Sequence, residues 1–377
     1  ANSTAGWGLE MWQGYSNTWG AVVAATGGGS IDVTGVSSGT TGYWGVLLGR
    51  TQILSSSGAI NVNGGIRGVR TAYAGYSNTY FGSRDTGVVT NSSANINIDG
   101  DRIKTDEGAT YLNTTGAAVV EPANGVHWIE NSTWNVYVGN TQPPSSLTVG
   151  KNQGTTDGST SIYLTVNQIV NGPIKFYAGI VSLNANLTAK LLEAPILIKA
   201  SRNIYSYSSK AYQTNYGPIT FWSNAANLTT NSGHIDISSY NSFNSANGTA
   251  MPTNKATSIA AAASIGTGDI TFAGGLADAN NSELPAGYAF IPNGFAMSGV
   301  HISNNTAIFT GGGDLTIRGK SNSSNTWWGG VLIRYYNTFN AGTGKVAFTG
   351  GGTSQIRGTT FHDLECVNAG KTLEFEA

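Results

Sequence analysis

Carboxylate side chains are densest between Asp99 and Glu107, in the sequence Asp-Gly-Asp-Arg-Ile-Lys-Thr-Asp-Glu. Calcium prefers several oxygen ligands from a flexible loop, and Asp99, Asp101, Asp106 and Glu107 would supply them. The spacing is not that of an EF-hand, and an arginine and a lysine lie inside the stretch. Two interpretations therefore stay open, a calcium site and a charged, solvated turn with local ion pairs.

Other aspartates recur beside short apolar segments, where a β-rich polysaccharide lyase or hydrolase would need paired carboxylates. Asp32 and Asp236 lie between two apolar residues, whereas Asp269 and Asp314 precede the first one. Stacked copies of such segments would not align all of these acids. The pattern favours scattered, solvent-facing carboxylates, and a carbohydrate-active enzyme is kept as an alternative.

The histidines and the cysteine do not show the spacing of a metal site or of a catalytic nucleophile with its base. The four histidines are far apart and form no zinc-ligand spacing with each other or with the single cysteine, Cys366. No Gly-x-Ser-x-Gly motif occurs. One cysteine excludes a disulfide within the chain, and we expect Cys366, which lies in an apolar run, to be buried. The sequence therefore predicts no enzyme activity and no cofactor, with calcium as the one ligand left open.

Aromatic residues give the strongest hint of a binding surface. Trp19, Trp44 and Trp328 each precede glycine and then an apolar, valine-containing segment, so they occupy the same phase of different repeats. Facing outward, such rings would form a platform for sugar rings or for another protein, and facing inward they would be core. The candidate surface consists of Trp19, Trp44, Trp327, Trp328, Tyr335 and Tyr336.

Composition shows that β-strands and turns must position these residues. Glycine supplies 52 of 377 residues, and charged residues only 10% against an ordinary share of about 25%. Hydrophobic residues still reach 40%, enough to build a core. The net charge of −1, without blocks of like charge, argues against nucleic acid and anionic membranes as partners. No apolar run is long enough to span a membrane.

A short unit recurs along the chain, in which glycine leads an alternation of apolar and polar residues. Examples are GSIDVTG from Gly29, GAINVNG from Gly58 and GDITFAG from Gly268. Period-two alternation predicts strands with one buried face. A longer repeat from Gly29 matches one from Gly313, and repeats of about 30 residues with variable length favour an open solenoid. The prediction is an all-β, parallel β-helix with about three strands per coil.

We expect one continuous solenoid over residues 1–377, with irregular protruding loops near 140–160 and 244–264. Its predicted core is one inward set of aliphatic and aromatic residues. These are Ile31, Val33, Ile60, Val62, Ile96, Ile98, Ile219, Phe221, Ile235, Ile237, Ile270, Phe272, Leu315, Ile317, Val346 and Phe348.

The glycine-led strands, the segments YWGVLL and WWGGVLI, and the segment from Gly358 to Glu376 (GTTFHDLECVNAGKTLEFE) resemble filamentous-haemagglutinin-like bacterial surface proteins. These are large exported adhesins, and the resemblance implies a right-handed β-helix in an extracellular, secreted or cell-surface setting. It implies a structural or adhesive role rather than catalysis. A subunit of an extracellular filament or sheath that polymerises end to end is the alternative.

The ends of such a stack would expose unpaired strand edges and apolar side chains. We therefore expect end contacts at Trp7, Trp12, Leu373 and Phe375, made with an adjacent solenoid segment or with an identical subunit stacked end to end. A glycan or a host or cell-surface protein is a further candidate partner.

Overall fold

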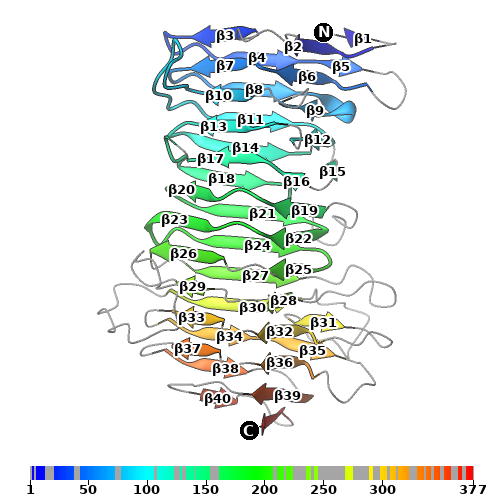
Figure 1. Ribbon diagram of the computed structural model, residues 1–377, viewed down its shortest axis with the longest axis vertical. Helices are drawn as coiled ribbons and strands as arrows, with labels where there is room; N and C mark the ends of the chain where they lie inside the picture. Colours follow the sequence, from blue (N-terminus) through cyan, green and yellow to red (C-terminus); the bar gives the residue numbers. More distant parts are fainter. Residues whose placement is uncertain are drawn as a thin grey trace. The chain divides into compact units, whose positions relative to one another are not determined.

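Parallel β-strands make up most of the computed structural model (Figure 1). It describes residues 2–3, 6–12, 21–37, 43–72, 78–105, 108–122, 128–129, 133–139, 141–152, 161–206, 210–215, 218–223, 235–238, 242–244, 268–274, 288–291, 298–303, 306–310, 313–321, 329–334, 337–340, 344–348, 352–357, 364–366 and 371–376. Among these, the one helical element is a short 3-10 turn, η1 (Gly65–Arg67). No helix of the described part is long and apolar enough to cross a membrane. The all-β prediction is confirmed.

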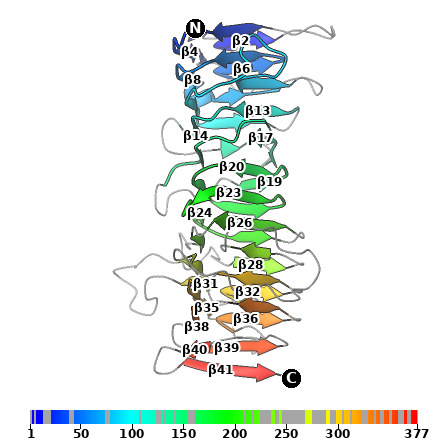
Figure 2. The ribbon, with the colours of Figure 1, turned by 90° about the vertical axis from the view of Figure 1, so that its left-hand side faces the viewer.

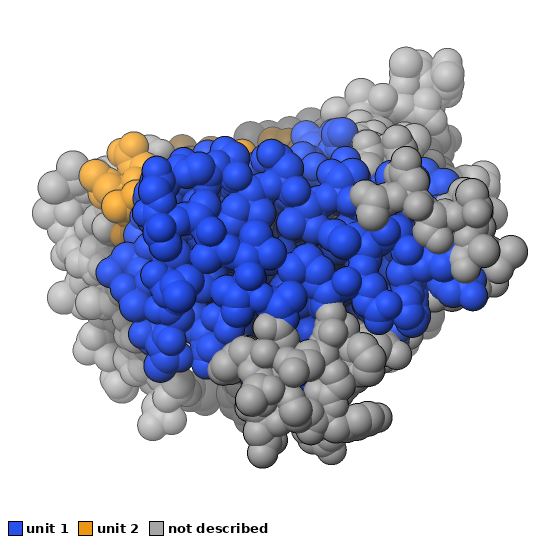
Figure 3. All heavy atoms as spheres, turned by 90° about the horizontal axis from the view of Figure 1, so that it is seen from above, with its two compact units in different colours: residues 1–153, 159–173 blue, residues 154–158, 174–377 orange. Residues whose placement is uncertain are grey.

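The chain divides into two units, which are described separately. Unit 1 comprises residues 1–153 and 159–173, and unit 2 comprises residues 154–158 and 174–377. Seen from above, the described atoms of unit 1 form a closely packed surface (Figure 3).

Unit 1 contains three sheets, which we call A1, B1 and C1. Sheet A1 contains β3 (Val22–Ala25), β7 (Gln52–Ser55), β10 (Thr79–Gly82), β13 (Thr110–Asn113), β17 (Val136–Val138) and β20 (Gln168–Val170). Sheet B1 contains β4 (Ile31–Thr34), β8 (Ile60–Asn63), β11 (Ile96–Asp99), β14 (Ala117–Glu121) and β18 (Ser146–Val149). Sheet C1 contains β2 (Leu9–Trp12), β6 (Val46–Gly49), β9 (Val69–Arg70), β12 (Arg102–Lys104) and β15 (Trp128–Ile129).

Two short strand pairs complete unit 1. They are β1 (Asn2–Ser3) with β5 (Val36–Ser37), and β16 (Thr133–Trp134) with β19 (Ser161–Leu164). Part of the loop predicted near 140–160 is in fact strand β18, because Leu147 and Val149 alternate inward and are fully buried. Residues 153–160 of that loop, and residues 245–264 of the second predicted loop, lie outside the described residues.

Unit 2 repeats the arrangement in sheets A2, B2 and C2. Sheet A2 contains β23 (Leu187–Leu192), β26 (Ala211–Asn215), β29 (Ser242–Asn244), β33 (Ala307–Phe309) and β37 (Thr338–Asn340). Sheet B2 contains β21 (Ile174–Ala178), β24 (Ile196–Ala200), β27 (Ile219–Ser223), β30 (Ile270–Gly274), β34 (Leu315–Ile317), β38 (Val346–Phe348) and β40 (Leu364–Cys366). Sheet C2 contains β22 (Ile180–Leu183), β25 (Ile204–Ser206), β28 (Ile235–Ser238), β32 (Val300–Ser303), β36 (Val331–Arg334), β39 (Gly352–Arg357) and β41 (Lys371–Glu376). A separate pair joins β31 (Ala289–Ile291) to β35 (Gly319–Ser321).

Within each unit, every strand pairs in parallel with the equivalent strand of the next turn of chain, which we call the next coil. In sheet B1, Ile31 stands opposite Ile60, and Ile60 stands opposite Ile96. Figure 2 shows the same stacking in unit 2, where β28, β32, β36, β39 and β41 follow one another. Equivalent side chains therefore form columns, with apolar columns inside and polar or aromatic columns outside.

The predicted core is confirmed, since all sixteen residues of that set are buried, with exposures of 8% or less. Aromatic rings stack inside as well: Phe221 and Phe272 lie 5.3 Å apart with an interplanar angle of 13°. The prediction that Cys366 is buried is wrong, because its side chain is exposed. It is the register partner of the buried Phe348, but it lies on β40 at the edge of the described sheet B2.

Glycine is required where two turns of backbone touch. A Cβ atom on Gly45 would lie 1.9 Å from the carbonyl oxygen of Gly64. In both copies of the long sequence repeat, two glycines approach each other closely. A Cβ on Gly35 would lie 2.1 Å from the carbonyl oxygen of Gly45. In the second copy, a Cβ on Gly319 would lie 2.0 Å from the carbonyl oxygen of Gly330. The abundance of glycine thus follows in part from these close approaches.

Candidate functional site

The predicted calcium ligands are only partly described. Asp99 ends β11 and stands opposite Glu121 of β14, while Asp101 directly precedes β12. Burial raises the pKa of the Asp99 carboxyl, and the positive charge of Lys151 opposes that shift. Asp106 and Glu107 lie outside the described residues. In the part of the chain that is described, no three His, Cys, Asp or Glu side chains are placed to hold a metal ion.

Of the two alternatives left open for the tryptophans, outward surface and core, Trp44 takes the second. Its side chain is only 2% exposed, and the guanidinium of Arg102 lies 4.0 Å from its ring centroid. A cation over the face of tryptophan stabilises this packing, so Trp44 is core. The other members of the predicted surface lie outside the described residues. These are Trp19, Trp327, Trp328, Tyr335 and Tyr336.

The predicted end contacts lie on terminal strands or beside them. Trp7 is 37% exposed and packs edge-on against Tyr43, with 6.2 Å between ring centroids. Trp12 is the last residue of β2. On β41, Phe375 is 61% exposed and Leu373 is half-buried.

Two of the recurring aspartates bind backbone rather than one another. Asp269 accepts the backbone N–H of Asp314 at 2.9 Å, and Asp314 accepts that of Lys345 at 3.0 Å. Asn95 does the same for Ala117 at 2.9 Å. A side-chain acceptor just before the first inward residue of a strand thus binds the backbone of the next coil. This hydrogen bond explains why a carboxylate or amide recurs at that position.

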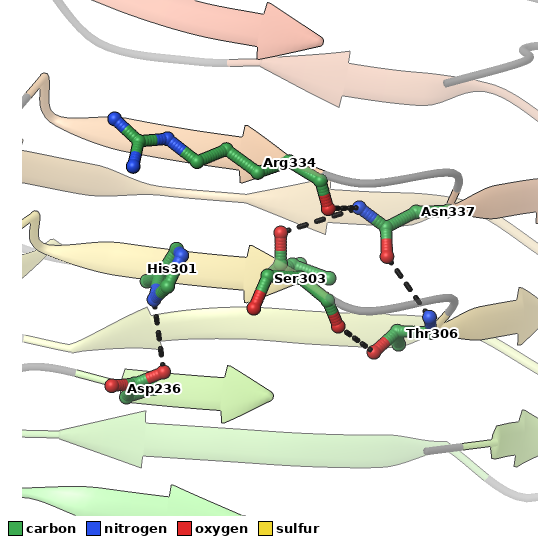
Figure 4. Close-up of polar contacts among 7 residues, drawn as sticks. Asp236, His301, Ser303, Thr306, Arg334 and Asn337 are labelled. Carbon is green, nitrogen blue, oxygen red and sulfur yellow. Dashed lines mark hydrogen bonds and ion pairs between the residues drawn. The ribbon is translucent and has the colours of Figure 1, made fainter. Parts of the chain in front are cut away.

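Asp236 and His301 form a carboxylate–imidazole pair that bridges two neighbouring coils. They stand opposite each other on β28 and β32, with 3.0 Å between Oδ1 of Asp236 and Nδ1 of His301 (Figure 4). Their side chains are 22% and 19% exposed, respectively. An ionised carboxylate can only accept a hydrogen bond, so Nδ1 of His301 carries the proton in this contact.

Tyr205 on β25 continues this column on the other side of Asp236. Burial raises the pKa of the Tyr205 hydroxyl; the hydrogen bond from Asn203 opposes the shift, and the negative charge of Asp236 adds to it. The Nδ2 atom of Asn203 lies 2.8 Å from the phenol oxygen. Tyr205, Asp236 and His301 therefore form one column over three successive coils of sheet C2, with a side-chain bridge between Asp236 and His301.

The turn that follows β32 is fixed to the turn that follows β36. The backbone N–H of Thr306 donates to Oδ1 of Asn337 at 2.9 Å, while the amide nitrogen of Asn337 donates to the carbonyls of Arg334 and Ile302. Figure 4 shows these contacts beside the Asp236–His301 pair. Both strand ends near the pair are thereby held in place.

A carboxylate that orients an imidazole is the arrangement used in general base catalysis and at metal sites. Here, however, Nε2 of His301 is itself buried, whereas a general base must reach its substrate. The geometry therefore suits a bridge between coils better than proton transfer. This pair was not predicted from the sequence, although both residues lie between two inward residues of their strands, in HIDI and VHIS.

Unit 1 carries two further outward columns that were not predicted from the sequence. Asp32, Asn61 and Asn97 follow one another on sheet B1, linked by side-chain hydrogen bonds. A column of three tyrosines lies on sheet A1.

No protein-family model, curated protein or solved structure matches this chain.

Proposed function

We propose that each unit is a right-handed parallel β-helix with about three strand positions per coil, and that the chain is a non-catalytic, structural or adhesive segment of a large exported bacterial surface protein. The resemblance to filamentous-haemagglutinin-like proteins supports the setting, and the parallel, in-register columns support the architecture. In this proposal the outer face serves stacking and contact with partners.

One observation carries the proposal: outward polar side chains on successive coils bind one another. The columns Asp32–Asn61–Asn97 and Asp236–His301 are bridged by side-chain contacts, and Asp269 and Asp314 each bind the backbone of the next coil. A repetitive scaffold needs this outer bracing between coils because each coil contacts only its neighbours. Such residues are then committed to the stack rather than to a substrate.

Labelling of intact cells tests the proposed cell-surface location. Antibodies raised against the purified chain should label the surface of intact cells that produce it, and mild protease treatment of those cells should remove the label. Label that appears only after the cells are permeabilised would contradict an extracellular role.

A sugar-release assay tests the absence of catalysis. The purified chain should release no unsaturated or reducing sugars from pectin-like polymers, with and without added calcium. Release that is abolished by Asp236→Asn or Asp99→Asn would contradict the proposal in favour of a polysaccharide lyase or hydrolase.

A further inference from the structure

Three tyrosines on successive coils of unit 1 form one outward column. Tyr80, Tyr111 and Tyr137 lie on β10, β13 and β17 and are direct register partners. The rings of Tyr80 and Tyr111 lie 4.6 Å apart with an interplanar angle of 7°, and those of Tyr111 and Tyr137 lie 5.0 Å apart at 25°. All three side chains are half-buried, so part of each ring is in contact with solvent.

Stacking limits what this column can recognise. The faces of the rings lie against one another at the spacing of paired strands, so the outer surface offers ring edges and hydroxyls rather than open ring faces. A sugar ring would have no free face of Tyr111 to stack on. What the arrangement supplies is two pairs of phenol rings stacked face to face.

We propose that this column is an oxidative cross-linking site, where a diffusible one-electron oxidant joins Tyr111 to Tyr80 or to Tyr137 through a carbon–carbon bond. Each phenol of a pair gives one electron to the oxidant and its hydroxyl proton to water, which leaves two phenoxyl radicals. The radicals couple through one ring carbon beside each oxygen. The hydrogens on those carbons are then lost as protons while the oxygens are reprotonated, and both rings become aromatic again.

The balance of this step is simple. Two electrons reduce two molecules of oxidant, two protons go to water, and the joined pair is lighter by two hydrogen atoms. A phenoxyl radical shares its unpaired electron between the oxygen and ring carbons that include the two beside it, and the rings of each pair already lie 4.6 and 5.0 Å apart between centroids. The parallel strands hold the pair in place, so the reaction needs no encounter between separate molecules.

The middle ring must take part in every cross-link within the column. Tyr80 and Tyr137 both pair with Tyr111, and they are separated from each other by one whole coil. Tyr163 is the natural control, because it is 41% exposed but stands opposite Thr133 rather than another tyrosine. Exposure alone therefore predicts reaction at Tyr163, whereas stacking predicts reaction at Tyr111.

A Tyr80–Tyr111 bond would close a covalent loop between neighbouring coils. The chain has a single cysteine and so has no internal disulfide. A cross-link that closes a loop constrains the unfolded chain, as a disulfide does. The tyrosine column would supply that constraint in an oxidising setting without thiol chemistry.

The test exposes the purified full chain, at low concentration, to tris(bipyridine)ruthenium(III) made by light and persulfate. Dityrosine fluorescence and mass spectrometry of proteolytic fragments are then measured. We expect a monomeric product in which fragments containing Tyr111 are joined to those containing Tyr80 or Tyr137, with the loss of two hydrogens. Tyr111→Phe should remove this product, Tyr137→Phe should leave only the Tyr80–Tyr111 link, and Tyr163→Phe should change nothing.

Three outcomes would overturn the proposal: wild-type protein that gives no dityrosine, dityrosine found only in cross-linked dimers, or an unchanged yield in the Tyr111→Phe variant. Phenylalanine keeps the stacked ring, and far-UV circular dichroism of each variant checks that the fold is retained. Loss of product in a folded Tyr111→Phe variant then reports on the chemistry and not on the structure.

Discussion

Asn61 donates its side-chain amide to the carboxylate of Asp32 on the neighbouring coil, with 2.7 Å between Nδ2 and Oδ1. Asn97 in turn donates to Oδ1 of Asn61 at 2.8 Å. In both hydrogen bonds, on the outer face of sheet B1, the donor lies on the later coil and the acceptor on the earlier one. Asp32 accepts the last hydrogen bond of this series. Each amide in such a ladder supplies one donor and one acceptor, so its middle position is the most sensitive to substitution.

Replacing Asn61 by Asp tests this ladder. The change removes the donor and places a second carboxylate opposite Asp32, so we expect thermal stability at pH 7 to fall, by about 1 kcal/mol in the free energy of unfolding. Salt screens the repulsion between the two carboxylates, so the loss should shrink as the ionic strength rises. Asn97→Ala, which removes one hydrogen bond without adding charge, is the matched control and should show a smaller effect with little dependence on salt. Equal stability of Asn61→Asp and wild type at pH 7 would contradict the ladder.

Much of the fold could be predicted because the inward positions repeat with period two. Ile31, Ile60 and Ile96 are each the first apolar residue after a short turn, and all three are buried in register. Outward partners were harder to predict, because their pairing depends on the length of chain between coils. Asp32 and Asn61 are 29 residues apart, whereas Asp236 and His301 are 65 apart.

The phase of a residue within its repeat does not decide whether its side chain is exposed. Trp44 shares its phase with Trp19 and Trp328, and the sequence left an outward and an inward position open. The structure buries Trp44 beneath the guanidinium of Arg102, which comes from a strand two coils further on. Cys366 has an inward phase, yet it is exposed because β40 lies at the edge of the described sheet B2. Trp44 is decided by a contact with a coil distant in sequence and Cys366 by the position of its strand in the sheet, and local alternation carries no information about either.

Close backbone contact makes Gly45 intolerant of a side chain. Gly45→Ala would place a methyl carbon 1.9 Å from the oxygen of Gly64, and backbone held in a sheet cannot move aside cheaply. We expect a loss of about 3 kcal/mol in the free energy of unfolding, at the upper end of the cost of overpacking, or failure to fold. Gly29→Ala is the matched control, because nothing lies within 4 Å of a Cβ atom there, and it should change stability by no more than about 0.5 kcal/mol. Chemical denaturation of the purified variants measures both, and similar losses at the two positions would contradict this account.

A double-mutant cycle measures the bridge between Asp236 and His301. Asp236→Ala and His301→Ala each remove one partner of the pair, and the double variant removes both. We expect the single changes to be non-additive, with a coupling of about 1 kcal/mol, because the partners are in direct contact and mostly buried. Purely additive losses of stability would show that the contact contributes nothing to the stacking of the coils.

Alkaline pH should weaken the fold through phenols that are half-buried or buried. Burial raises the pKa of Tyr111 above its ordinary value of 10.0, and the neighbouring phenolates of Tyr80 and Tyr137 add to the shift. Burial likewise raises the pKa of Tyr212, against the opposing effect of its hydrogen bond with Ser206. Above pH 10 the unfolded chain loses these protons while the folded chain keeps them. The stability that these phenols contribute is therefore fully present below pH 10 and is lost as the pH rises through their pKa values in the folded chain.

Tyr111→Phe isolates one of these phenols. The variant lacks the hydroxyl that titrates but keeps the stacked ring, so its stability should fall less steeply than that of wild type between pH 10 and pH 12. Thermal unfolding across this range measures the slope, and absorbance titration of phenolate in the folded protein should show one late-titrating tyrosine fewer. An identical slope in wild type and Tyr111→Phe would mean that the hydroxyl of Tyr111 titrates equally in both states, contrary to its half-buried position between two other rings.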